Sequence, residues 1–142
     1  MKTTNDLLNI LNDTGNTSQL DSYLKEIEKY KDLNYINYFE AVMKEHNIKK
    51  NEIVSSSGIS RTYCYQMLNG TRKPGRDNAV TLCIAAHFNL AETIRYLELL
   101  ELGALYPKNK RDSIIIYAIN RELSVTDTNE LLYSKNEKTL GE

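Results

Sequence analysis

The sequence predicts an all-α fold, and three observations support this. Apolar residues recur at three- and four-residue spacing along the 142-residue chain, which is the period of an amphipathic helix. Two prolines and six glycines leave little material for the turns of a strand-rich fold. Ser, Thr, Asp or Asn stands before several of these segments, where the side chain can cap a helix. The length is that of one domain, or of one domain with a small extension, and the 41% hydrophobic and 26% charged residues are ordinary for a globular protein.

Residues 1–33 are expected to form an N-terminal extension of two helices. The first spans residues 3–11, with Thr3 as its cap, and ends before a loop around Gly15. The second begins near Ser18 and carries an apolar stripe on one side. That stripe consists of Leu20, Leu24 and Ile27. We interpret these helices as cover for the core, with dimerisation as the alternative.

The next predicted helix spans residues 34–46. Tyr35, Phe39 and Val42 recur at the spacing of one helix face. His46 stands at the C-terminal end, where a positive charge interacts favourably with the helix dipole. No second His, Asp or Cys stands at ligand spacing from it, so a metal or catalytic role is not expected.

The stretch around which the chain is organised is residues 47–76, expected to form two short helices, a tight turn between them and a basic loop. The turn is Ser57-Gly58-Ile59-Ser60. Gly58 can adopt the left-handed backbone that ends one helix, and Ser60 can cap the next helix through its hydroxyl. A short glycine-containing turn between two short helices is typical of a helix-turn-helix motif.

The second of these helices, residues 61–69, divides its side chains between two faces. At about 100° per residue, the inner face holds Tyr63, Cys64, Met67 and Leu68. The outer face is polar, lacks acidic residues and comprises Arg61, Thr62, Tyr65, Gln66 and Asn69. Arg can make a bidentate contact to guanine, and Gln or Asn can do the same to adenine. This face indicates base recognition, with a solvated polar helix as the alternative.

Charge is distributed unevenly along a chain whose net charge is −1. Residues 44–76 hold seven Lys or Arg against two Asp or Glu, whereas residues 1–43 and 77–142 are both acidic. Neutralisation of phosphates depends on local charge, so a basic segment within an acidic protein is compatible with DNA binding. The acidic flanks should weaken attraction to random DNA.

Residues 76–107 and 111–142 align as an internal repeat with an offset of 35 residues. The identical pairs include Arg76 with Arg111, Asp77 with Asp112, Ile84 with Ile119, Thr93 with Thr128, Leu97 with Leu132, and Leu105 with Leu140. Each unit is expected to contain two helices, joined at Asn89 in the first and at Ser124 in the second.

The second unit, residues 108–142, is expected to stack on the first as a C-terminal helical pair. Pro107 should prevent one continuous helix across the link between them. Leu140 is a candidate anchor for the polar tail. The side chains expected to be buried by stacking are Ile114, Ile115, Tyr117, Ala118, Leu131 and Leu132.

The cysteines and the absence of targeting signals favour a cytoplasmic protein. Cys64 and Cys83 both lie on predicted inner faces, where reduced thiols act as small core residues. The residues after Lys2 are polar rather than the apolar core of a secretory signal, and no apolar run has the length of a membrane span.

Several residues of the central stretch stand where Cro/XRE-type, phage-repressor-like proteins have their helix-turn-helix motif. These residues are Ile53-Val54, Gly58-Ile59-Ser60, Asn69-Gly70 and Pro74. The chain resembles that family from about Tyr35 to Leu99, and departs from it at Lys50, where the family usually has Gln. The resemblance implies a five-helix DNA-binding domain, here residues 34–103, whose second motif helix enters the major groove.

The resemblance also implies which residues contact double-stranded DNA. Base edges would be contacted by Arg61, Thr62, Tyr65 and Gln66. Phosphates would be contacted by Lys50, Asn69, Arg72, Lys73 and Arg76. Members of this family usually bind twofold-related half-sites as dimers, so a homodimer is expected. The candidate dimer surfaces are residues 1–33 and the C-terminal pair.

Two classes of function remain open at this stage. The first is a sequence-specific transcriptional regulator, supported by the turn, the acid-free face and the local charge. The second is a protein-interaction module, such as an adaptor or antitoxin-like partner. The overall acidity of the chain and its ten tyrosines are suited to this role. An enzyme is not expected, because the sequence has no phosphate-binding loop, paired-carboxylate constellation or Cys–His arrangement, and no cofactor or metal is implied.

Overall fold

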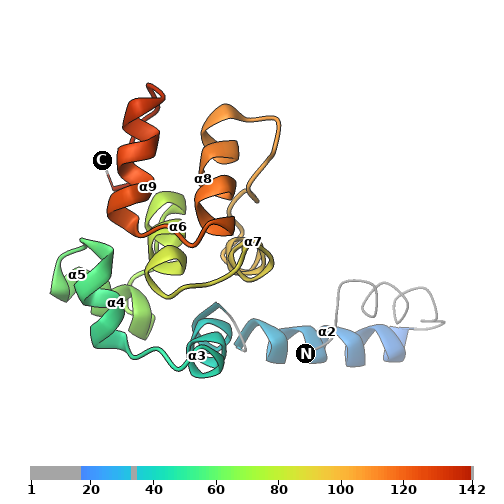
Figure 1. The fold of residues 1–142 in the computed structure, drawn as a ribbon. Coiled ribbons are helices and arrows are strands. Elements are labelled where there is room, and N and C mark those ends of the chain that lie inside the picture. Colours follow the sequence, from blue (N-terminus) through green and yellow to red (C-terminus); the bar gives the residue numbers. More distant parts are fainter. Residues whose placement is uncertain (1–16, 33–34, 142) are drawn as a thin grey trace. The chain divides into compact units, whose positions relative to one another are not determined.

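The computed structural model describes residues 17–32 and 35–141, and these form eight α-helices and no strand (Figure 1). The all-α prediction is therefore confirmed for the described residues. The predicted helix at residues 3–11 lies outside them. The helices are α2 (Thr17–Asp32), α3 (Tyr35–Glu45), α4 (Lys50–Ser57), α5 (Arg61–Asn69), α6 (Arg76–Ala85), α7 (Leu90–Leu99), α8 (Lys110–Asn120) and α9 (Val125–Ser134).

The chain divides into two units, Met1–Asn34 and Tyr35–Glu142. In the first, α2 exposes Leu20 and Leu24, which lie one helical turn apart on the predicted apolar stripe. The second unit holds the helices expected for residues 34–103 together with the C-terminal pair. None of the described helices combines the length and apolar character needed to cross a bilayer.

The core of the second unit joins α3 to α7 through aromatic rings. The Phe39 ring lies 4.6 Å from Phe88 and 4.9 Å from Tyr96, measured between ring centroids, and all three side chains are buried. Tilted ring contacts of this kind stabilise the core in addition to the burial of apolar area. The core extends through Cys64 and Cys83, which are free thiols with no solvent exposure. Burial raises the pKa of both thiols, so they are protonated and unreactive at neutral pH.

Three connections between helices, α3–α4, α6–α7 and α8–α9, turn through the same backbone conformation. Asn47, His87 and Glu122 each occupy the left-handed region, with φ of 56°, 61° and 55°. In the α6–α7 and α8–α9 hairpins the next helix begins after a capping residue: Asn89 accepts a hydrogen bond from Glu92 N, and Ser124 accepts one from Asp127 N. These are the two junctions expected from the repeat.

The α6–α7 and α8–α9 hairpins exchange equivalent salt bridges. Arg76 donates to both carboxylate oxygens of Asp112, at 2.9 and 2.8 Å. Arg111 donates to both oxygens of Asp77, at 2.9 and 3.0 Å. The packing is exchanged in the same way, since α6 contacts α9 and α7 contacts α8. Reciprocal contacts of this kind define an approximate twofold relation between the hairpins.

Each of these arginines also secures the end of its own hairpin. Arg76 donates to the carbonyls of Gly103 and Ala104, and Arg111 donates to those of Lys138 and Thr139, at the positions 35 residues further on. The segments held in this way carry Leu105 and Leu140 into the core, where each is 5% exposed.

The burial expected for the C-terminal pair is correct except at one position. Ile115, Ala118 and Leu132 are fully buried, and Ile114 and Leu131 are half-buried. Tyr117 is 49% exposed, and the guanidinium of Arg121 lies 5.1 Å from its ring centroid. The prediction that Tyr117 is buried was wrong, because its ring serves instead as a surface for a cation.

Candidate nucleic-acid interface

The turn before α5 is formed by local hydrogen bonds and one glycine. α4 ends at Ser57, and Gly58 follows with φ of 75°, a conformation that other residues adopt only with strain. The Ser57 hydroxyl accepts a hydrogen bond from Ile59 N at 3.2 Å. The Ser60 hydroxyl accepts one from Tyr63 N at 3.4 Å and caps α5. The turn and the Ser60 cap together fix the residue at which α5 begins.

α5 buries one face and exposes the other. Cys64, Met67 and Leu68 are buried in the core. On the opposite side Arg61 and Thr62 are exposed, and Tyr65 and Gln66 are partly exposed. The four residues predicted to face base edges therefore share the accessible side of one short helix.

Two side chains of this face contact each other. The guanidinium of Arg61 lies 5.4 Å from the centroid of the Tyr65 ring, one helical turn away. A cation–π contact of this length restricts the arginine without using its hydrogen-bond donors. Tyr65 therefore limits the positions open to the Arg61 guanidinium.

The loop after α5 carries two further cations, Arg72 and Lys73. Gly70 has φ of 86°, and a Cβ there would collide with the side chain of Ile36. Arg72 N donates to the carbonyl of Gln66 at 3.1 Å, and the Arg72 guanidinium lies 5.5 Å from the Tyr63 ring centroid. Arg72 and Lys73 are exposed. The loop is therefore attached to α5 through both backbone and side chain.

Lys50 reaches the same region from the start of α4. Its ammonium donates to Asn69 Oδ1 at 2.8 Å and lies 3.4 Å from a carboxylate oxygen of Glu40. Lys50 and Asn69, both predicted to contact phosphate, are thus hydrogen-bonded to each other. Residues 53–76 contain no Asp or Glu. Among the described residues, the carboxylate paired with Lys50 is that of Glu40.

Arg76, the fifth residue predicted to contact phosphate, is engaged elsewhere. Its guanidinium is held by Asp112 and two carbonyls between the hairpins. Burial disfavours the charged form of Asp112, but hydrogen bonds from Arg76 and from Tyr106 N outweigh it and lower the pKa of Asp112. The shared Arg-Asp pairs of the repeat were a signal for this role. The other contacts that sequence reasoning missed, Arg61 on Tyr65 and Lys50 to Asn69, depend on tertiary placement.

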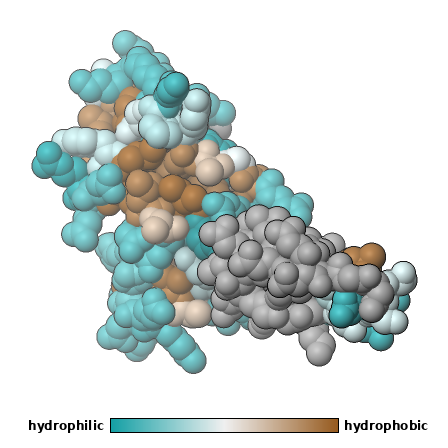
Figure 2. Space-filling view, turned by 90° about the vertical axis from the view of Figure 1, so that its right-hand side faces the viewer, coloured by the Kyte–Doolittle hydropathy of each residue, from teal (hydrophilic) through white to brown (hydrophobic). Residues whose placement is uncertain are grey.

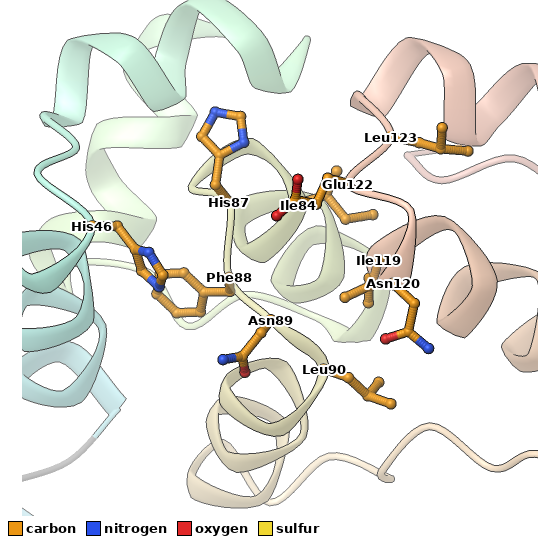
Figure 3. A pocket seen from close by; sticks show the side chains of 10 residues that line it. All are labelled: His46, Ile84, His87, Phe88, Asn89, Leu90, Ile119, Asn120, Glu122 and Leu123. Atoms are coloured by element: carbon orange, nitrogen blue, oxygen red, sulfur yellow. The ribbon is translucent and has the colours of Figure 1, made fainter.

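A separate hollow of about 390 Å³ lies where the α3–α4, α6–α7 and α8–α9 connections meet (Figure 3). His46 Nε2 lies 2.8 Å from Glu92 Oε1, and its ring stacks on Phe88 with 6.0 Å between centroids. Glu92 Oε1 also accepts a hydrogen bond from Asn89 N. His46 therefore connects the end of α3 to the capping box of α7. No group of three or more candidate metal ligands is present among the described residues.

No family model, curated protein or solved structure matches this chain. The helix-turn-helix resemblance therefore rests on the motif residues of the sequence.

Proposed function

We propose that this protein is a sequence-specific DNA-binding transcriptional regulator that reads the major groove with α5. The observation that supports this most strongly is the exposed face of α5, where Arg61, Thr62, Tyr65 and Gln66 lie together beside exposed cations. An α-helix fits the major groove, and these side-chain types recognise base edges there. In this proposal α3–α7 correspond to the five helices of a phage-repressor-like domain acting in the cytoplasm.

The base-facing residues have distinct roles in the proposal. Arg61, oriented by Tyr65, makes a bidentate contact to guanine O6 and N7. Gln66 bonds N6 and N7 of adenine, and Thr62 contacts either a base edge or a thymine methyl group. The Tyr65 ring limits how closely α5 approaches the floor of the groove, so its own contact is made at the groove wall.

The phosphate contacts are proposed for Lys50, Asn69, Arg72 and Lys73. Lys50, at the start of α4, and Asn69, at the end of α5, act as one hydrogen-bonded unit, while Arg72 and Lys73 reach the backbone beyond the end of α5. Arg76 is omitted, because removing it from Asp112 would leave a buried carboxylate without its partner.

A homodimer is proposed as the DNA-bound form, since two copies of such a domain read twofold-related half-sites. The candidate dimer surfaces are residues 1–33 and the α8–α9 hairpin. Both lie outside the helices proposed to contact DNA.

Selection from a random double-stranded oligonucleotide pool tests the proposal. The full chain at low salt is expected to enrich one motif with twofold-related halves. The double variant Arg61→Ala, Gln66→Ala is expected to retain its fold and enrich no motif. A wild-type selection that enriches nothing at low salt would refute DNA recognition.

The second candidate function is protein interaction, favoured by the exposed tyrosines. Tyr106, Tyr117 and Tyr133 are 56%, 49% and 79% exposed. Tyrosine is enriched in protein interfaces because its ring is both apolar and hydrogen-bonding. Affinity capture that recovers one stoichiometric partner, with binding unchanged by Arg61→Ala and Lys73→Ala but lost in Tyr117→Ala, would favour this function.

A further inference from the structure

A cavity of about 450 Å³ lies between the turn that precedes α5 and the C-terminal hairpin. The turn contributes Gly58, Ile59 and Ser60, and α9 contributes Thr126 and Asn129. Its volume is within the range of sites that hold small molecules. The cavity therefore adjoins the residue that caps the proposed recognition helix.

The described residues that line the cavity are uncharged, and several retain unused hydrogen-bonding groups. Asn129 uses Oδ1 to accept from Leu140 N at 2.7 Å, which leaves its amide N–H groups. Asn78 makes one long contact, of 3.5 Å, to the Tyr63 hydroxyl. Within the described part of the chain, the Thr126 hydroxyl has no hydrogen-bond partner. Unused donors and acceptors of this kind suit a neutral ligand with several polar groups.

The approximate twofold relation shows that the hairpin packing does not require this polarity. The positions 35 residues away from Thr81, Thr126 and Asn129 are occupied by Ile116, Ala91 and Ile94. Those residues lie on α7 and α8, and Figure 2, which views that side of the second unit, shows apolar residues gathered there. One framework thus carries apolar residues on one side and a polar cavity on the other, so the packing of the hairpins does not account for the polar residues.

We propose that this cavity binds a neutral molecule that presents the hydroxyl groups of a sugar ring. Each hydroxyl both donates and accepts, which matches the amides of Asn78 and Asn129 and the hydroxyl of Thr126. The apolar face of such a ring fits against Ile59 and Val125, which also line the cavity. A charged ligand is disfavoured because none of the described lining residues offers a counter-charge.

Occupancy of the cavity would act on the DNA-binding face through Tyr63. The Tyr63 hydroxyl faces the cavity beside Asn78, and its ring supports the guanidinium of Arg72. A ligand that bonds the hydroxyl therefore changes the position of a proposed phosphate contact. This coupling rests on the proposed function, whereas the binding site itself does not.

The binding site is tested without DNA, on the full chain, by following backbone amide resonances during titration. The probes are D-glucose and L-arabinose as free sugars, and uridine and adenosine as sugars attached to a base. We expect at least one probe to shift Gly58, Ser60 and Thr126 in a saturable manner. Binding by free sugars would identify the ring as sufficient, and binding by nucleosides alone would show that the base contributes. The absence of saturable binding by all four would overturn the proposal.

Matched variants exploit the twofold relation. The double variant Asn78→Ser, Thr126→Ala installs the residues found at the related positions and is expected to lower affinity about tenfold, as for the loss of two hydrogen bonds. The control Ala91→Thr introduces a hydroxyl at the related position outside the cavity and should leave affinity unchanged. If the double variant and the wild type bound the probe with equal affinity, the probe would bind outside this cavity. DNA affinity measured with and without the bound probe then tests the coupling alone.

Discussion

The α6–α7 and α8–α9 hairpins share one framework but differ in what covers them. Their turns, capping residues and Arg–Asp pairs correspond at an offset of 35 residues. α6 and α7 also pack against α4 and α3. Where the first hairpin has Leu82 and Ala86, both fully buried, the second has the exposed Tyr117 and Arg121. The comparison shows that the residues shared by the two units build the hairpin. The residues on its outer side differ, because other helices cover that side only in the first hairpin.

The largest expected effect contrasts two equivalent positions with unequal burial. Leu82→Ala removes a fully buried side chain and should lower the free energy of unfolding by about 2–5 kcal/mol. Tyr117→Ala removes a half-exposed ring and should cost less than about 1 kcal/mol. Chemical denaturation of both variants measures the difference. Equal losses would show that the two hairpins are covered alike.

The next expected effect contrasts the two salt bridges. The Asp112 side chain is 7% exposed and that of Asp77 is 29% exposed. Asp112→Ala removes the more buried carboxylate together with its hydrogen bonds from Arg76 and Tyr106 N, and should cost about 3 kcal/mol. Asp77→Ala should cost about 1 kcal/mol, because solvent screens the more exposed carboxylate. The ranking is checked by denaturation, and a larger loss for Asp77→Ala would contradict the difference in burial.

The pH dependence of stability should report on the Asp112 site. Although burial opposes it, hydrogen bonding by Arg76 lowers the pKa of Asp112 in the folded state below the ordinary value of 3.8. A carboxylate of this kind stabilises the fold above its unfolded-state pKa, and that stabilisation is lost as pH falls through the folded value. The free energy of unfolding should therefore decrease below about pH 4. Asp112→Asn should show a shallower decrease, and an unchanged acid profile would exclude Asp112 as its source.

The smallest expected effect is seen by comparing two exposed lysines, one in the loop after α5 and one in the segment after α9. Lys73→Ala should weaken DNA binding similarly across sequences and reduce the slope of log affinity against log salt by about one. Lys138→Ala, in the segment after α9, should leave the slope unchanged. Salt titrations of both variants against one duplex measure this. Equal slopes for Lys73→Ala and the wild type would remove that residue from the proposed phosphate contacts.

Local features of the fold were accessible from the sequence because they depend on neighbouring residues. The helix predicted for residues 61–69 is α5, and the predicted cap Ser60 performs that role. Leu140, a candidate anchor, is buried. The spacing of apolar residues and the capping of helices involve only residues close in sequence, so both can be recognised from the sequence alone.

Features that depend on distant partners were not accessible in the same way. Arg76 lies in the basic segment and was assigned to phosphate, yet its carboxylate partner is 36 residues away. Tyr117 stands on an apolar helix and was assigned to the core, because the sequence does not indicate which face of a repeat is covered. The candidate site was predictable as a helix face, but the contacts that orient its side chains were not.

The central claim is that Arg61 reads a base, and one pair of variants tests it directly. Arg61 lies over Tyr65 and Arg121 lies over Tyr117, at nearly equal distances of 5.4 and 5.1 Å, so Arg121→Ala is a matched control. On the motif enriched by selection, Arg61→Ala should lose about 1–3 kcal/mol of binding free energy and relax preference at one base pair. Arg121→Ala should bind like the wild type. Equal affinities of Arg61→Ala and the wild type for that motif would contradict the claim.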